Sequence, residues 1–281
     1  HRETVHLVTQ KREERTKMLQ ITSIEKTFNP GTINEKKALD KVSLHLNPGD
    51  FVTIIGGNGA GKSTLMNAIT GVWPVDNGSI ILDSVNVTGL PEYKRAKFIG
   101  RVFQDPMMGT AHDMQIIENL ALAYRRGKKR TLKWGITKKE KEMFHEKLKI
   151  LGLGLEDRMT SKVGLLSGGQ RQALTLLMAS LQTPKLLLLD EHTAALDPTT
   201  AAKVLQISEE IIERDKLTAM MITHNMNDAI VHGNRLIMMN NGQIIYDVQG
   251  EEKKKLTKAD LMAKFAEIAG EDAESDKMLL S

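Results

Sequence analysis

Two short stretches of the sequence carry side chains whose types and spacing could do chemistry. The first, GGNGAGKS at residues 56–63, has the spacing G-x-x-x-x-G-K-[ST] that cradles phosphate groups. Glycines let successive backbone N–H groups turn toward an anion, and a helix that begins there adds the positive end of its dipole. We therefore expect Lys62 to reach the β- and γ-phosphates of a nucleotide and the Ser63 hydroxyl to ligate Mg²⁺.

The second stretch, LLLLDEHTAALDP at residues 186–198, places Asp190, Glu191 and His192 in a row. The apolar run reads as a buried parallel strand, and its terminal Asp190 fits the Walker B pattern of a Mg²⁺ ligand beside the nucleotide. Glu191 is expected to orient or deprotonate the attacking water. His192 reads either as a second general base or as a packing residue of the next loop. Neighbours on an extended segment point opposite ways, which favours packing.

These side chains need a fold that brings them together. Strand-like and helix-like segments alternate along the chain, which predicts an α/β fold. FVTII runs into the glycines of the phosphate loop and KSTLMNAIT continues as a helix, so the motif lies between a strand and a helix. Further strands are predicted in TAMMITH and, as a hairpin with an Asn-Gly turn, in RLIMMNNGQIIYD. Residues 105–162 show the three- and four-residue apolar spacing of helices.

Composition narrows the class of protein. The 281 residues are 41% hydrophobic and 26% charged, as in an ordinary globular chain. The absence of cysteine excludes disulfides and Cys-ligated metals, and a net charge of +4 is too small to imply nucleic-acid binding. No stretch is apolar enough to span a membrane. We read residues 1–17 as a non-native or disordered extension before Met18, and residues 251–281 as a charged helical tail.

Further motifs identify a family. LLSGGQ at residues 165–170 resembles the signature of ATP-binding-cassette (ABC) ATPases, and it precedes the Walker B strand as it does in that family. Gln104 in RVFQDP resembles the Q-loop glutamine, and AALD ending in Asp197 resembles the D-loop. His224 resembles the switch histidine, and Phe28 stands where the family places an aromatic ring on adenine. The resemblance covers residues 18–250.

The resemblance implies a P-loop NTPase (RecA-like) α/β core with an N-terminal antiparallel β subdomain and an α-helical subdomain inserted at about residues 105–180. It implies catalytic roles for Glu191, His224 and Gln104, and Mg²⁺ ligation by Ser63, Gln104 and Asp190. The ATP contacts that we expect are Phe28, Gly56, Gly57, Asn58, Gly59, Ala60, Gly61, Lys62, Ser63, Thr64, Ser167, Gly168, Gly169, Gln170 and Asp197.

The resemblance also implies partners. Two ATPase chains, expected as a homodimer, would enclose two ATP molecules, with the signature of each chain capping the phosphate loop of the other. Hydrolysis would drive a separate transmembrane permease, which holds the ATPase at the cytoplasmic face of a bacterial membrane. The permease is expected to dock near residues 105–119, and the basic stretch 125–141 reads as a solvated face or as a contact with lipid headgroups.

The signature and D-loop sequences are similar to a bacterial uptake group that works with an extracytoplasmic substrate-binding protein, so import of a small solute such as an amino acid is expected. Export remains an alternative. A soluble ABC ATPase acting on nucleic acid or ribosomes is disfavoured, because such relatives carry tandem cassettes or long coiled-coil insertions. We expect no nucleic-acid partner. The signature also argues against a kinase or GTPase.

Overall fold

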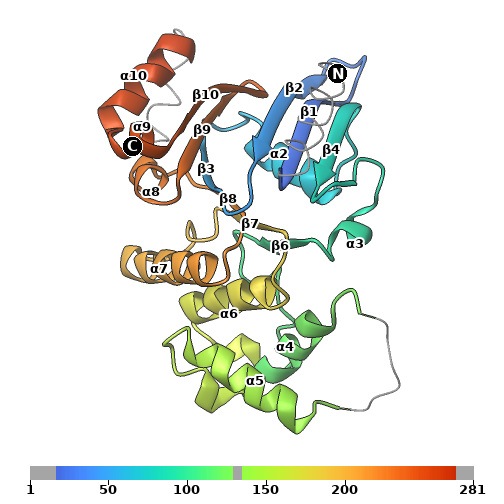
Figure 1. The fold of residues 1–281 in the computed structure, drawn as a ribbon, viewed down its shortest axis with the longest axis vertical. Coiled ribbons are helices and arrows are strands. Elements are labelled where there is room, and N and C mark those ends of the chain that lie inside the picture. The colour runs from blue at the N-terminus through green and yellow to red at the C-terminus, as the bar shows by residue number, and fades with distance from the viewer. Residues whose placement is uncertain (1–16, 129–134, 270–281) are drawn as a thin grey trace, which may run out of the picture.

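The computed structural model describes residues 17–128 and 135–269. Two β-sheets form the upper part of the molecule as drawn, and a helical region lies below them (Figure 1). The strands are β1 (Leu19–Phe28), β2 (Lys36–Leu46), β3 (Phe51–Ile55), β4 (Asn77–Leu82), β5 (Val85–Asn86), β6 (Ile99–Val102), β7 (Leu186–Asp190), β8 (Ala219–Ile222), β9 (Arg235–Asn240) and β10 (Gln243–Gln249).

Helices connect and cover these strands. The α-helices are α2 (Lys62–Thr70), α3 (Glu92–Arg95), α4 (Ile116–Arg125), α5 (Lys138–Lys149), α6 (Gly168–Ser180), α7 (Pro198–Arg214), α8 (Met226–Val231), α9 (Gly250–Lys254) and α10 (Lys258–Ala269). Two short 3-10 turns lie at Glu156–Arg158 and Val163–Leu165. In the part of the chain that the structure describes, every helix is too short or too polar to cross a bilayer.

The larger sheet has six strands in the order β10-β9-β3-β8-β7-β6. Neighbouring strands from β9 to β6 run parallel, and β10 closes the sheet as the antiparallel arm of the hairpin with β9. Every residue of β3 and β8 is buried, as expected for central strands covered on both faces. The parallel strands all end at one edge of the sheet, which is where ligands bind in open α/β folds.

The smaller sheet is antiparallel, with the strand order β2-β1-β4-β5. Alternate residues of β1 and β2, such as Leu19, Ile21 and Leu44, point into a core shared with helix α2 and with β3, β7 and β8. The buried face of this sheet therefore packs on the element that carries the phosphate loop. The mostly parallel six-stranded sheet and the antiparallel four-stranded sheet, with helices between the strands, agree with the predicted α/β fold class.

The helices α4, α5 and α6 form the lower part of the molecule (Figure 1). Their core is apolar, and Leu120, Phe144 and Leu148 are completely buried in it. Capping boxes begin α4 at Gln115, α5 at Thr137 and α6 at Ser167, where paired side chains satisfy backbone N–H groups. The predicted domain boundaries stay predictions. All of the expected extension at residues 1–17 except Lys17, and the end of the tail at 270–281, lie outside the described residues.

Helices α9 and α10 pack on α8 beside the β9–β10 hairpin (Figure 1). Leu261 and Phe265 of α10 are buried against Met226 and Ala229 of α8. Lys253 of α9 is almost fully buried, and its Nζ donates hydrogen bonds to the backbone carbonyls of α8's last turn and of the residues that follow it. The segment after residue 250 is thus attached to the helix that follows His224.

Candidate nucleotide-binding site

The residues predicted to bind nucleotide, bind metal or act in catalysis lie at the edge of the sheet where the parallel strands end. The phosphate loop follows β3, and Gln104 follows β6. Asp190 is the last residue of β7, Glu191 comes directly after it, and His224 follows β8. Because these four strands are neighbours in the sheet, one sequence motif from each strand reaches a common region. Two cavities with a shared boundary at Ser63 and Glu191 occupy that region.

The backbone of the phosphate loop requires glycine at two positions. Gly61 begins α2 in a left-handed conformation with φ 104°, and Gly56 has φ 153°. A Cβ atom on Gly56 would lie 2.3 Å from the carbonyl oxygen of Met239, and one on Gly61 would lie 2.6 Å from that of Ala38. Both approaches are shorter than van der Waals contact, so the chain packs its loop closely against β2 and β9.

Lys62 is buried in the phosphate loop, with 5% of its surface exposed. Its Nζ donates hydrogen bonds to the carbonyl oxygens of Gly56 at 2.6 Å and Gly57 at 3.0 Å. Beside the loop lies a cavity of about 370 Å³. Its lining includes these predicted residues: Phe28, Asn58, Gly59, Ala60, Gly61, Lys62, Ser63, Thr64, Glu191 and His224. The positive charge of the lysine, the backbone turn and the start of α2 suit a phosphate chain.

Phe28 stands at the end of β1 on the border of this cavity. Its ring meets the ring of Trp73 edge to face, with the ring centroids 4.8 Å apart and an angle of 78° between the planes. Trp73 lies three residues beyond α2, the helix that starts in the phosphate loop. An edge-to-face pair fixes the orientation of both rings. The sequence reasoning did not consider Trp73, although an aromatic residue near a phosphate-loop helix is a signal for it.

Glu191 and His224 contact each other at the border of the phosphate-loop cavity. His224 Nε2 lies 2.7 Å from Glu191 Oε1. The hydrogen bond from His224 is the main cause that lowers the pKa of Glu191, against the effect of burial, and the charge of Lys62 lowers it further. The carboxylate is therefore ionised at neutral pH. Glu191 has φ 48°, a left-handed conformation that costs free energy in a residue other than glycine.

The three predicted metal ligands line the second cavity, which has a volume of about 680 Å³. Ser63, Gln104 and Asp190 all line it, each from a different strand end or loop. A hydroxyl, an amide oxygen and a carboxylate are the hard oxygen donors that Mg²⁺ prefers, and phosphate oxygens complete such a set. Among the described residues there is no group of three or more His, Cys, Asp and Glu side chains that could hold a metal ion alone. The donor set fits a nucleotide-bound Mg²⁺.

Asp190 has a cationic partner that the sequence reasoning missed. Arg101 Nη2 lies 2.9 Å from Asp190 Oδ2, and the two side chains are only 13% and 15% exposed. Arg101 belongs to β6, a strand of four residues that was not predicted. The sequence did contain a signal for this partner, because a charged residue stands three positions before Gln104.

His192 lies away from both cavities. Its side chain is buried, and its Nε2 atom is 3.0 Å from the hydroxyl of Ser208 in α7. Burial, aided by the charge of His232, lowers the pKa of His192 to about 4, so the ring is neutral at pH 7. The packing interpretation is supported over the general-base interpretation, although Glu191 is left-handed and the segment is not extended as the prediction assumed.

The signature and D-loop residues form a separate group. Ser167 caps α6, its hydroxyl accepting a hydrogen bond from the Gln170 backbone N–H at 3.3 Å. Asp197 caps α7, where its carboxylate accepts from the Thr200 N–H at 3.1 Å. A Cβ on Gly168 would lie 3.3 Å from the Leu196 side chain, and one on Gly169 would lie 2.2 Å from the Thr200 side chain. The signature thus packs on the D-loop and α7, and its residues do not line the two cavities described above.

Known proteins are similar to this chain along most of its length. The sequence profile of the ABC transporter family matches residues 39–194. A tyrosine transport ATP-binding protein of Clostridioides difficile is 44% identical over 249 residues, which cover 88% of this chain and 98% of the relative. A phosphonates import ATP-binding protein of Lactobacillus acidophilus is 30% identical, over 87% of this chain and 94% of the relative.

Solved structures give the same result for the fold. A dimeric ATP-binding cassette in a post-hydrolysis state, bound to ADP and Pi, superposes with a TM-score of 0.70 at 29% identity. The match covers 83% of this chain and 98% of that cassette. A second cassette, in its ADP conformation, gives a TM-score of 0.70 at 31% identity over 84% of this chain and 92% of its own.

Proposed function

The chain belongs to the ABC transporter family as an ATP-hydrolysing cassette, and from this premise we propose that two copies enclose two ATP molecules and drive uptake of an amino acid through a separate permease. The observation that carries this proposal is the contact of Glu191 with His224 beside the phosphate loop. It puts an ionised carboxylate and a histidine where the terminal phosphate of a nucleotide would lie.

We assign the roles within one chain as follows. Phosphate oxygens bind to the backbone N–H groups of residues 57–64 and to Lys62. Phe28, oriented by Trp73, stacks on the adenine ring. Glu191 orients the attacking water and accepts its proton, and His224 holds Glu191 in position and contacts the γ-phosphate.

The metal is assigned to the second cavity. Ser63, Gln104 and Asp190 would hold Mg²⁺ there, and its charge would neutralise phosphate oxygens as the bond to the terminal phosphate breaks. Gln104 would have a second role besides metal binding. It lies between the sheet and the segment that leads to the helical region, so it would connect the metal site to that segment. A change at the nucleotide can therefore move the segment that the permease contacts.

A second copy of the chain supplies the groups that one copy lacks at its nucleotide. Ser167, Gly168, Gly169 and Gln170 stand at the N-terminus of α6, where a hydroxyl and backbone N–H groups suit a phosphate. Because they do not line the cavities beside their own chain's phosphate loop, we propose that they bind the ATP held by the partner. One of the solved cassettes that the chain resembles is dimeric, which supports this arrangement.

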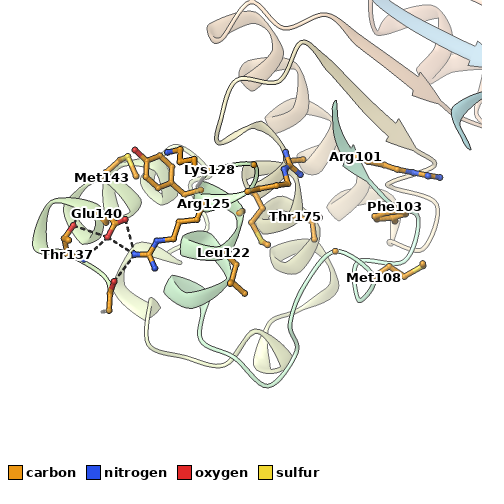
Figure 2. A pocket seen from close by; sticks show the side chains of 18 of the residues that line it. Arg101, Phe103, Met108, Leu122, Arg125, Lys128, Thr137, Glu140, Met143 and Thr175 are labelled. Atoms are coloured by element: carbon orange, nitrogen blue, oxygen red, sulfur yellow. Dashed lines mark hydrogen bonds and ion pairs between the residues drawn. The ribbon is translucent and has the colours of Figure 1, made fainter. Parts of the chain in front are cut away.

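The permease would dock on a groove of about 1280 Å³ beside the helical region. Figure 2 shows Arg101 and Phe103 at one end of it and the Arg125, Thr137 and Glu140 cluster at the other. Apolar side chains from the segment after Gln104 and from α4, α5 and α6 share its lining with basic residues. The apolar residues are Met108, Leu122, Met143 and Met178, and the basic residues are Arg125, Arg126, Lys128 and Lys139. An amphipathic permease helix with acidic residues would fit this lining.

The cargo is proposed from the relatives. The Clostridioides difficile relative, which the chain matches along nearly all of its length, is a tyrosine transport protein. An extracytoplasmic substrate-binding protein would deliver the amino acid, and the ATPase would sit on the cytoplasmic face of the membrane through the permease. Uptake of labelled tyrosine, methionine and phosphonate by cells with and without the gene would test the cargo. Uptake of phosphonate alone would contradict the amino-acid assignment.

The central experiment is Glu191→Gln, which keeps the shape of the side chain and removes the base. We expect ATP binding to persist, turnover to fall by about 100-fold or more, and a dimer to form with ATP in light scattering. His224→Ala should also lose most turnover, whereas His192→Pro should keep it. Full turnover in Glu191→Gln would refute the role of the glutamate.

The permease proposal needs its own variant. Met108 is 68% exposed in the groove, and Val231, 71% exposed at the end of α8, offers a matched control. We expect Met108→Asp to lose co-purification of a polytopic membrane protein from detergent-solubilised membranes, while Val231→Asp keeps it. Bound RNA in place of a membrane protein would contradict the transport function.

A further inference from the structure

Arg101 joins three parts of the nucleotide site. One terminal nitrogen, Nη1, donates a hydrogen bond to Asn67 Oδ1 of α2 at 2.8 Å, and the other, Nη2, donates to Asp190 Oδ2 at 2.9 Å. Its guanidinium also lies over the ring of Phe103, 4.7 Å from the centroid. The residue therefore connects the phosphate-loop helix, the end of β7 and the segment that begins with Phe103 and Gln104.

The ion pair is held in a defined position. Only 13% of the Arg101 side chain and 15% of the Asp190 side chain are exposed, so water screens the pair weakly. Contacts from both terminal nitrogens and from the ring restrict the guanidinium far more than a surface pair would. Arg101 and Asp190 both line the 680 Å³ cavity, together with the other proposed metal ligands Ser63 and Gln104.

A fixed positive charge at this place opposes a second cation. An arginine that satisfies one carboxylate oxygen stabilises the carboxylate without metal, and it repels a divalent cation that approaches the same group. Removal of the arginine would leave Asp190 more available to a metal. If the ion pair had only a structural role, removing the arginine would change the stability of the fold. It would leave unchanged the Mg²⁺ concentration at which the site binds metal.

We propose that Arg101 is the resident counter-ion of Asp190, and that it competes with Mg²⁺ for this carboxylate and so sets the Mg²⁺ concentration at which the nucleotide site loads. The proposal rests on the function proposed above. Arg101 is thus a positioning residue that acts through Asp190. Its stacking on Phe103 links the loss of this ion pair to the segment that carries Gln104.

The test measures metal binding without catalysis. The full chain is saturated with a non-hydrolysable ATP analogue, Mg²⁺ is titrated, and the rise in melting temperature gives the Mg²⁺ concentration for half of the effect. We expect Arg101→Met to lower this concentration by about tenfold, the scale of one charge interaction at short range in a partly solvated site. Arg101→Lys keeps the charge but loses the planar contacts with Asn67 and Phe103, so we expect a clearly smaller shift than in Arg101→Met.

Lys185→Met is the matched control. Lys185 directly precedes β7, at the opposite end of the strand from Asp190, and it pairs with Asp83 at the surface at 2.9 Å. Its loss removes the same net charge without touching the site, so the half-point should not move.

The outcomes separate the two proposals. An unchanged or higher Mg²⁺ half-point in Arg101→Met would overturn the counter-ion role, as would an equal shift in Arg101→Lys. Should Arg101→Met fail to fold, Arg101→Gln, which keeps hydrogen bonds and loses the charge, takes its place with the same expectation. If the native chain gained no stability from the analogue with Mg²⁺, the proposed ATPase site itself would be wrong.

Discussion

The buried His192 makes folding stability depend on pH in a way that can be calculated. Burial lowers the pKa of this histidine from 6.5 to about 4, so the native protein keeps the ring neutral while the unfolded chain binds a proton below pH 6.5. Between these two values the unfolded state holds more protons than the native state, and the free energy of unfolding therefore falls as the pH falls. His192→Leu conserves the volume and removes the titrating group.

One pKa unit corresponds to about 1.4 kcal/mol, so the contribution of His192 to the free energy of unfolding should fall by about 2 kcal/mol from pH 7 to pH 5 and about 3 kcal/mol by pH 4. Urea unfolding of the native chain and His192→Leu at pH 7, 6 and 5 measures this difference. Exposed His45, changed to Gln, controls for loss of a histidine. Parallel stability curves for the native chain and His192→Leu would refute the buried, neutral ring.

Three further variants test the site and its support. Lys62→Ala should weaken ATP binding by about 2 kcal/mol, or some 30-fold, measured with a fluorescent nucleotide, because charge-assisted hydrogen bonds to phosphate are lost; native affinity would contradict the lysine's role. Phe28→Ala should weaken ATP binding about tenfold, since base stacking is lost, and the affinity for ATP should then be close to that for inorganic triphosphate. A retained preference for ATP would mean that adenine binds elsewhere. Lys253→Met should lower the free energy of unfolding, measured in urea, by about 2 kcal/mol, because the carbonyls of Ile230 and Gly233 lose their donor. Lys255→Met, at an exposed position, should not lower it.

Local chemistry explains why so much of the site was visible in the sequence. Gly56 and Gly61 are required by the loop backbone, and Lys62 must follow them to stand at the start of α2. The apolar run before Asp190 reflects a strand buried on both faces. Such features depend on a few consecutive residues, and the order of strands in an α/β sheet then brings them to one edge.

Features set by tertiary contacts were not visible in the same way. β6 was missed because Gly100 and Arg101 interrupt its apolar pattern. The glycine is needed there because a Cβ atom would lie 2.4 Å from the carbonyl oxygen of Ala179 in α6. The left-handed conformation of Glu191 is likewise set by its surroundings, since its N–H donates to the Ile222 carbonyl at the end of β8.

The division of the site into two groups has a mechanical consequence. A Cβ atom on Gly168 would lie 3.3 Å from the Leu196 side chain and one on Gly169 would lie 2.2 Å from the Thr200 side chain, so the start of α6 packs closely against the D-loop and the first turn of α7. The D-loop starts three residues after Glu191, which contacts His224 beside the chain's own phosphate loop. When a partner's ATP binds the signature, we expect a displacement of α6 to pass through the D-loop to Glu191 of the same chain. Under the proposed dimer, each ATP would thus influence the catalytic carboxylate of the neighbouring site, and hydrolysis at the two sites should be coupled. Mixed dimers of native and Ser167→Ala chains should then hydrolyse less than half as fast as native dimers, and a value of half would indicate independent sites.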